Sequence, residues 1–479
     1  MITTSHEAPL RGPSAARGTK VCTVTVGWFA GLVHPDSKQL TEALRAAVRD
    51  GSLAAGSRVP STRSLAQELG IARGTVTRAY DQLVAEGFLV ARQGAPTVVA
   101  ELLATPAQPD APEPAQPGVA RWDFRSGRPD LSSFPRRDWL AASRRALRDV
   151  PTDDLDYGDP QGHPRLRVAL AGYLARERAV ATTPGNIIVC NGYTQALSLL
   201  SNALADQGES SVDFEDPSAP HLWDIPAGFG MSVHGIPVDG EGIDVSQLRS
   251  RAVVVTPAHQ FPLGVSMSSA RRAELARRAK DEDLLVIDDD YDGEFRFDRQ
   301  PMGSLQGMGP DNVVYAGTAS KTLAPALRLA WLALPSRLVG PVRELKRNSG
   351  LHAPLFEQLA MAELILSGAY DQHVRRSRAT YRQRREHLGE ALRGMRAKHR
   401  PHPAGISAGL HVTLQLDPEG PTELEVLDRA RRRSVELQVL GPHWLSPGSH
   451  PPGVIVGYAA PSDHAFRPAL QALVSVLER

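Results

Sequence analysis

Residues 317–328 read Gly-Thr-Ala-Ser-Lys-Thr-Leu-Ala-Pro-Ala-Leu-Arg, and this stretch holds the lysine on which the fold assignment depends. Lys321 follows an expected strand and is flanked by small and apolar residues. A lysine in such surroundings can have a lowered pKa and act as a nucleophile toward an aldehyde. Arg328 lies seven residues further on, and together with the hydroxyls of Thr318 and Ser320 it could hold a phosphate. For this stretch alone, a surface lysine with a structural arginine remains an alternative.

An acidic run, Asp288-Asp289-Asp290-Tyr291, ends a second apolar segment at 284–287. A carboxylate in that place can pair with a protonated pyridine nitrogen, and a phenol can bond the oxygen on the same ring. A metal-binding acidic cluster or a polar strand cap are the alternatives.

A turn of sequence Asn-Gly-Tyr-Thr-Gln at 191–195 follows an expected strand and opens a helix. Backbone N–H groups at the start of a helix point toward whatever anion binds there. All three stretches lie at the ends of expected strands, which is where open α/β sheets bind their ligands.

Short β-branched runs alternate with helical stretches such as 193–205 and 269–281 beyond residue 122. This alternation predicts an α/β fold with a mainly parallel sheet covered on both faces. The expected strands are 186–190, 211–215, 252–256, 284–288, 312–316 and 330–334.

The composition of the whole chain excludes several classes of protein. Among 479 residues, 54 are Lys or Arg and 53 are Asp or Glu, a net charge of +1, and 42% are hydrophobic. These values exclude a disordered chain and a wholly basic nucleic-acid binder. Two cysteines, Cys22 and Cys190, cannot form a disulfide framework or a thiolate metal site, so no metal centre is expected. Without an apolar run long enough for a bilayer, we expect a cytoplasmic protein with no membrane partner.

The chain is expected to have four segments. Residues 1–34 form a flexible arm and 35–100 a compact domain, after which 101–122 is a linker. Five prolines between 104 and 117 favour an extended spacer there. The remaining body, 123–479, divides into a large part at about 150–345 and a small C-terminal part at about 354–479.

The compact domain has the pattern of a winged helix-turn-helix. Apolar spacing predicts helices at 37–50, 61–69 and 72–86, the second ending at Gly70, and a wing with a turn at Gln93-Gly94. Two short helices joined by a tight turn are the helix-turn-helix arrangement, whose second helix enters the major groove. A three-helix bundle with solvated arginines is the alternative, and a net charge of only +2 over 36–100 does not decide between them.

The segment from Gly51 to Leu89, which includes Arg63-Ser-Leu-Ala and Arg73-Gly-Thr-Val-Thr-Arg78, closely resembles the DNA-binding domain of GntR-type transcription regulators. Ala72 departs from that family, which usually has Ser or Thr there, so a helix cap or a phosphate contact is lost. The DNA-contacting residues implied by the resemblance are Arg63, Arg73, Gly74, Thr75, Thr77 and Arg78, with Gly94 in the wing.

The three cofactor stretches, together with Tyr-Gly-Asp-Pro-Gln-Gly at 157–162 and Thr-Pro-Ala-His-Gln-Phe-Pro-Leu-Gly at 256–264, resemble the fold-type I aminotransferases. The resemblance implies pyridoxal 5′-phosphate (PLP) held as an internal aldimine on Lys321, Asp289 on the pyridine nitrogen and Tyr291 on the ring hydroxyl. It also places His259 near the ring. The residues implied to hold the phosphate are Thr318, Ser320, Arg328 and the turn of Gly192, Tyr193, Thr194 and Gln195, with Tyr157 reaching across from a partner subunit.

A GntR-like domain linked to an aminotransferase-like body resembles the MocR-type transcription regulators. That resemblance implies a homodimer, head-to-tail, that binds PLP and a double-stranded DNA operator with repeated half-sites. It also implies a small effector, which is PLP itself, an amine or an amino acid. A working aminotransferase with an accessory DNA-binding module, or a regulator whose body has lost PLP, are the other hypotheses.

Two departures from the aminotransferases favour sensing over transamination. The segment Pro217-Ser-Ala-Pro220 lacks the aromatic residue that stacks on the ring, so His221 or Trp223 would have to substitute. The strand at 453–458 lacks the arginine that binds a substrate carboxylate, which costs a charge-assisted bond of roughly 1.5–3 kcal/mol. An arginine-rich run at 375–385 is interpreted as a solvated helix face or a dimer contact.

Overall fold

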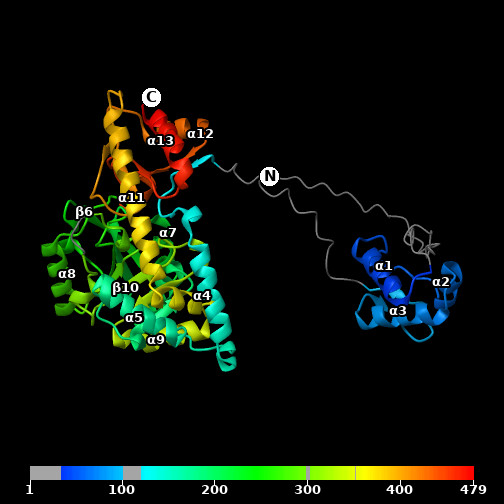
Figure 1. Ribbon diagram of the computed structural model, residues 1–479. Coiled ribbons are helices and arrows are strands. Elements are labelled where there is room, and N and C mark those ends of the chain that lie inside the picture. Colours follow the sequence, from blue (N-terminus) through cyan, green and yellow to red (C-terminus); the bar gives the residue numbers. More distant parts are fainter. Residues whose placement is uncertain (1–33, 101–119, 298–301, 351, 479) are drawn as a thin grey trace, which may run out of the picture. The chain divides into compact units, whose positions relative to one another are not determined.

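A computed structural model describes residues 34–100, 120–297, 302–350 and 352–478. The chain divides into two compact units, Met1–Gly118 and Val119–Arg479 (Figure 1). The predicted arm, up to residue 33, and most of the predicted linker, 101–119, lie outside the described residues. None of the described helices is long and apolar enough to cross a membrane.

The N-terminal unit is a winged helix-turn-helix, as predicted. Its helices are α1 (Ser37–Arg49), α2 (Thr62–Leu69) and α3 (Arg73–Ala85), and the wing pairs β1 (Leu89–Val90) antiparallel with β2 (Val98–Val99). Local chemistry sets the helix ends. Asp36 and Gln39 form a capping box at α1, Ser61 accepts from the Ser64 N–H at α2, and Gly70 ends α2 at a φ of +65°. The helices pack through Leu40, Leu44, Leu65, Val76 and Leu83.

The start of α3 lacks a side-chain cap, because its N-cap residue is Ala72. Its extended backbone, with φ −67° and ψ 136°, is the conformation from which a serine would accept an N–H of the first turn. We expect Ala72→Ser to stabilise α3 by about 1 kcal/mol. Hydrogen exchange at residues 73–76 of the full chain should slow accordingly. Ala72→Val, which adds bulk without an oxygen, should give no such protection, and equal protection in both variants would contradict the capping argument.

The C-terminal unit is built on an eight-stranded sheet in the order β4-β11-β10-β9-β8-β5-β6-β7. Strands β10, β9, β8, β5 and β6 are successively parallel, while β11 runs antiparallel to both β10 and β4. The mainly parallel sheet is therefore confirmed. The strands are β4 (Ile187–Cys190), β5 (Ser211–Asp216), β6 (Ser232–Asp239), β7 (Gly242–Ile243), β8 (Ala252–Val255), β9 (Leu285–Asp289), β10 (Val313–Thr318) and β11 (Ala330–Ala333).

Strands β6 and β7 were not expected from the sequence. The β6 segment contains a glycine and a proline, and its side chains are mostly half-buried or exposed, so it lacks the continuous apolar run of the central strands. It lies near the edge of the sheet, where such residues are tolerated.

Helices cover both faces of this sheet (Figure 1). On one face α6 (Tyr193–Asp206), α7 (Pro220–Ala227) and α9 (Ser336–Asn348) pack against residues such as Ile188 and Ile287. The opposite face carries α4 (Arg136–Asp149), α5 (Pro164–Arg178), α8 (Ser269–Asp281) and α10 (Leu355–Leu366). Because helices bury the central strands on both faces, these strands consist of continuous runs of apolar residues.

The small C-terminal part contains α11 (Ala369–Gly394) and a four-stranded sheet in the order β12-β13-β16-β15. Trp122–Asp123, as β3, pairs in parallel with β14 (Val435–Glu436), and Phe124 is buried in the same core. The beginning of the body therefore packs with its end. The other elements are α12 (Glu423–Arg432), α13 (Asp463–Leu477), β12 (His402–Pro403), β13 (Val412–Gln415), β15 (Gln438–Val439) and β16 (Gly453–Val456).

The interpretation of the arginine-rich run on α11 was wrong for Arg384. This side chain is buried and donates to Asp130 Oδ2 at 2.8 Å and to the Ala459 carbonyl at 2.9 Å. It therefore joins α11 to the segments around it, and a helical surface pattern alone does not reveal such a partner.

Candidate functional site

A cavity of about 720 Å³ opens at the carboxyl ends of the sheet strands in the C-terminal unit. The turn at Gly192 follows β4, Asp289 ends β9 and Thr318 ends β10, so three separate strands deliver the predicted residues to one place. Nine of the predicted cofactor residues line this cavity. They are Gly192, Tyr193, Thr194, Asp289, Tyr291, Thr318, Ser320, Lys321 and Arg328.

Lys321 lies just beyond β10, and its Nζ donates to the Gly127 carbonyl at 2.8 Å. Burial lowers the pKa of Lys321, while the nearby carboxylates of Asp289 and Asp292 oppose the shift. Within the described residues, the amine bonds to this neutral carbonyl and to no carboxylate. This is the environment in which a lysine serves as a nucleophile.

Asp289 and Tyr291 reach the cavity from the end of β9. Burial raises the pKa of the Asp289 carboxyl well above its ordinary value, and Tyr193 and Lys321 partly offset the rise. A buried carboxyl of this kind regains its charge when a cation is placed against it, as a pyridinium nitrogen would be. The Tyr291 hydroxyl donates to the His259 carbonyl at 3.0 Å.

An anion-binding corner lies at the start of α6. Gly192, the N-cap of this helix, has a φ of +91° and no side-chain cap, so the first N–H groups face the cavity. Arg328, itself in the left-handed region at a φ of +51°, donates to the Asn191 carbonyl at 2.8 Å. A Cβ on Gly192 would lie 3.1 Å from the Arg328 guanidinium carbon, so glycine is what allows the arginine to lie against this turn.

The hydroxyls beside this corner are also ordered. Thr318 Oγ1 lies 3.1 Å from Ser320 Oγ and 3.2 Å from the Leu329 carbonyl, and it accepts the Ser320 N–H. With Thr318 donating to one of these two acceptors, the Ser320 proton is free to turn toward the cavity. Guanidinium, hydroxyls and helix N–H groups together form a donor set that fits a phosphate.

The wall that would face a ring carries Ala219 and His221, both of which line the cavity. Trp223, the other aromatic candidate, is not among the lining residues and donates from Nε1 to Ser218 Oγ at 2.8 Å. Burial lowers the pKa of His221, which favours a neutral imidazole. Of the two candidates, His221 is therefore the one that lines the cavity.

Three of the predicted cofactor residues are not part of the cavity lining. Gln195 is buried on α6, where its Oε1 accepts the Asn191 N–H at 2.6 Å. Tyr157 is 91% exposed, which leaves it free to contact another molecule but not this cavity. His259 is buried behind Tyr291, with its Nδ1 2.9 Å from Asp292 Oδ2.

Several lining residues were missed by sequence reasoning. Ser126 donates to Gln438 Oε1 at 2.7 Å, so the first segment of the body and the small part meet at the cavity rim. Glu215 lies one residue before the end of β5, and burial raises its pKa to about 7. No local pattern distinguishes these residues, because tertiary packing alone brings them together. The others that line the cavity include Gly127, Ser218, Phe261, Leu427, Leu437, Val439, Pro442 and His443.

The predicted DNA-contacting residues lie on one helix-turn-helix. Arg63 is exposed on α2, and Arg73, Gly74 and Thr77 are exposed on α3. Arg73 Nε donates to Thr62 Oγ1 at 3.2 Å, which holds this arginine beside the start of α2. Thr75 is half-buried and Arg78 is exposed, while Gly94 turns the wing at a φ of +78°.

Two families match the chain. Residues 123–426 match the family Aminotransferase class I and II, and residues 36–99 match the family Bacterial regulatory proteins, gntR family. Among solved structures, an archaeal alanine:glyoxylate aminotransferase superposes with a TM-score of 0.67 at 24% identity, covering 75% of this chain and 91% of that one. The fold of the C-terminal unit is thus that of a fold-type I aminotransferase.

Relatives that match nearly the whole chain are transcription regulators. The HTH-type regulator YdeL of Bacillus subtilis is 33% identical over 92% of this chain and 96% of its own length. The probable rhizopine catabolism regulatory protein MocR of Rhizobium meliloti is 32% identical over 92% and 93%, respectively. The pyridoxine biosynthesis regulator PdxR of Corynebacterium glutamicum is 31% identical over 90% and 93%. The chain belongs to the MocR-type transcription regulators, which confirms the predicted combination of domains and favours the regulator over the aminotransferase.

Proposed function

We propose that this protein is a PLP-binding regulator whose C-terminal unit senses PLP or a primary amine and whose N-terminal unit binds double-stranded DNA. The observation that carries the proposal is the meeting of Lys321, Asp289 and Arg328 around one cavity. Lys321 would form the covalent link to PLP, Asp289 would face the pyridine nitrogen and Tyr291 the ring oxygen. The phosphate would be held by Arg328, Ser320, Thr318 and the turn at Gly192, Tyr193 and Thr194.

PLP supplies an aldehyde that exchanges reversibly between Lys321 and other primary amines. Such an exchange would release the Lys321 side chain, and a regulator can respond to that change. The experiment that tests the function is a spectral titration of the purified protein with PLP, amines and amino acids, run beside a DNA-binding assay. Spectral changes that never alter DNA binding would argue against sensing.

A homodimer is part of this proposal. The helices α4 and α5, which both pack against α10, expose apolar side chains: Leu140 and Leu147 of α4 and Val168 of α5. Tyr157 is exposed as well, in the segment between α4 and α5. We expect a second copy to cover these residues and to receive Tyr157 at its own cavity. Two copies would present two recognition helices to repeated half-sites.

The cavity favours an amine over an α-amino acid as effector. Among the described lining residues, Lys321 and Arg328 are the only lysine or arginine, and both are assigned to PLP. The four strand residues Gly453–Val456 carry no charge, and burial lowers the pKa of the lining His443, which favours its neutral form. A carboxylate entering this cavity would lose its hydration without gaining a cation.

A matched pair of ligands tests this preference. We expect 3-methylbutylamine to change the spectrum of the PLP-loaded protein at a concentration roughly 10- to 100-fold lower than leucine, which differs from it by one carboxylate. Absorbance titration of the full chain measures both. Equal half-saturation concentrations, or repeated turnover of leucine with an added keto acid, would instead support the aminotransferase hypothesis.

A further inference from the structure

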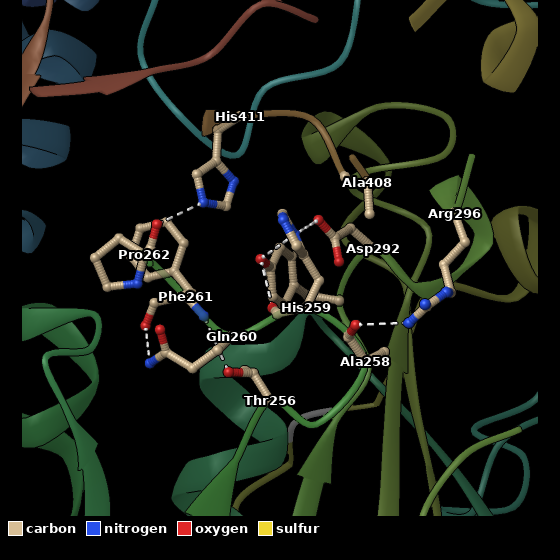
Figure 2. Close-up of polar contacts among 12 residues, drawn as sticks. Thr256, Ala258, His259, Gln260, Phe261, Pro262, Asp292, Arg296, Ala408 and His411 are labelled. Atoms are coloured by element: carbon tan, nitrogen blue, oxygen red, sulfur yellow. Dashed lines mark hydrogen bonds and ion pairs between the residues drawn. The ribbon is translucent and has the colours of Figure 1, made fainter. Parts of the chain in front are cut away.

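A buried polar cluster lies next to Tyr291, outside the cavity lining. It consists of His259 in the loop after β8, Asp292 after β9 and His411 before β13 (Figure 2). The side chains of His259 and Asp292 are only 2% and 1% exposed. A buried carboxylate and a buried imidazole each need a hydrogen-bond partner, and here each is the partner of the other. No residue of the cavity lining takes part in this pair.

The hydrogen bonds fix where the protons lie. His259 Nδ1 is 2.9 Å from Asp292 Oδ2 and 3.2 Å from the Tyr291 hydroxyl oxygen. The carboxylate of Asp292 only accepts, so His259 Nδ1 carries the proton and donates. The Tyr291 oxygen thus lies beside an N–H donor, while its own proton is directed to the His259 carbonyl at 3.0 Å.

The surroundings bury this pair, and Lys321 is a nearby cation that interacts with Asp292. Gly409, at a φ of +73°, lies so close that a Cβ there would clash with both Asp292 Oδ2 and His259 Nδ1. His411 faces His259 with ring centroids 5.0 Å apart and lies 3.2 Å from the Pro262 carbonyl through Nε2 (Figure 2). Burial and the neighbouring His259 hold the pKa of His411 well below its usual value, so it adds no charge. Asp289 and Glu215 are the other carboxyl groups that act on Tyr291.

We propose that His259 and Asp292 are positioning residues for the Tyr291 phenol. Asp292 keeps the proton on His259 Nδ1, and this N–H supports the phenol oxygen so that the phenol proton is available to the ring oxygen of bound PLP. Hydrogen bonds in such a chain strengthen one another in a buried site. The inference rests on the proposed function, because it requires PLP in the cavity with its ring oxygen at Tyr291.

A divalent metal held by the same three side chains is the competing assignment, since His411 Nδ1 is buried without a partner in the described part of the chain. The separation of 2.9 Å between His259 Nδ1 and Asp292 Oδ2 is that of a direct hydrogen bond, and the Gly409 backbone covers the same two atoms. The geometry therefore favours the hydrogen-bonded pair, and metal content becomes an outcome of the test.

The test is the pH dependence of the band at about 420 nm in the PLP-loaded full chain. A phenol that donates to the ring oxygen competes with the proton shared between that oxygen and the lysine nitrogen, so loss of the donor raises the titration midpoint. Tyr291→Phe should raise it by about 0.5–1 pH unit, the size of one hydrogen bond. His259→Leu should raise it in the same direction, whereas His259→Asn, whose amide N–H occupies the Nδ1 position, should restore it.

A second variant separates the hydrogen bond from simple charge. Asp292→Asn should raise the midpoint in the wild-type background. The new amide group donates to His259 Nδ1, which then carries no proton to donate to the Tyr291 oxygen. In a Tyr291→Phe background the same change removes only a negative charge and should lower it. His411→Phe, which keeps an aromatic ring, should leave the midpoint unchanged.

The outcomes separate the role of His259 and Asp292 from PLP binding itself. A normal band with the same midpoint in His259→Leu as in the wild type, or Asp292→Asn lowering it equally in both backgrounds, would overturn the inference and leave PLP binding intact. Stoichiometric divalent metal in the wild type that is lost in His411→Phe would also overturn it. A wild-type chain without the band would overturn the proposed function and the inference together.

Discussion

Replacing Lys321 with alanine should abolish the band at about 420 nm that PLP gives on linking to the protein, because this band requires the covalent bond to an amine. The other contacts to PLP would remain, so the variant should still bind it weakly and reversibly. Absorbance after gel filtration measures the loss. Of the five lysines in the described part of the chain, Lys321 is the one that lines the cavity.

Lys280→Ala is the matched control, since Lys280 is exposed on α8 and has no part in the cavity. It should keep the full band. A band that persists in Lys321→Ala, or that disappears in Lys280→Ala, would show that the covalent link forms elsewhere.

The lowered pKa of Lys321 adds a pH dependence to the same reaction. An amine attacks an aldehyde in its neutral form, and the neutral fraction grows as the pH rises through the pKa of the folded protein. Burial places the pKa of Lys321 below its ordinary value of 10.5, so the rate of PLP attachment to the apo protein should level off at a lower pH than for an exposed lysine. Stopped-flow absorbance across the pH range measures this. A profile still rising steeply above pH ~10.5 would contradict the shift.

Local patterns in the sequence predicted the parts of the site that local structure creates. Gly192, Asp289 and Thr318 could be foreseen because each lies where a strand ends, and the carboxyl ends of parallel strands share one edge. The winged helix-turn-helix could be predicted in the same way, because Ser61 and Gly70 mark the ends of α2 in the sequence itself.

The rest depends on contacts between distant segments. Gly127 receives the Lys321 amine from 194 residues away, and Ser126 meets Gln438 across 312 residues. No spacing rule connects such pairs. The burial of His259 was unpredictable for the same reason, since its partner Asp292 follows another strand and Gly409, which covers both, comes from the small part. Strand ends therefore predict which residues gather at the cavity, while tertiary packing determines what surrounds them.

Replacing both Arg63 and Arg73 with alanine should reduce specific DNA binding by at least about 100-fold. Each arginine that contacts a base or phosphate contributes on the order of 1–3 kcal/mol, and a dimer would lose each of them twice. The N-terminal unit has a net charge of only +2 over residues 36–100, so few other cations can compensate. A duplex selected from a random library by the wild-type protein serves as the probe, with affinity measured by fluorescence anisotropy.

The control removes one positive charge from another helix of the same unit. Lys38 is exposed in the first turn of α1, and Lys38→Ala should change affinity by only a few-fold through the general field of the protein. The salt dependence of binding separates direct phosphate contacts from the general field of the protein. Each lost phosphate contact lowers the slope of log K against log salt by about 1. Wild-type affinity in the double variant would refute the assignment of α2 and α3 as the DNA-reading elements. A weaker but still selective complex would mean that the wing at Gly94, rather than α3, carries the specificity.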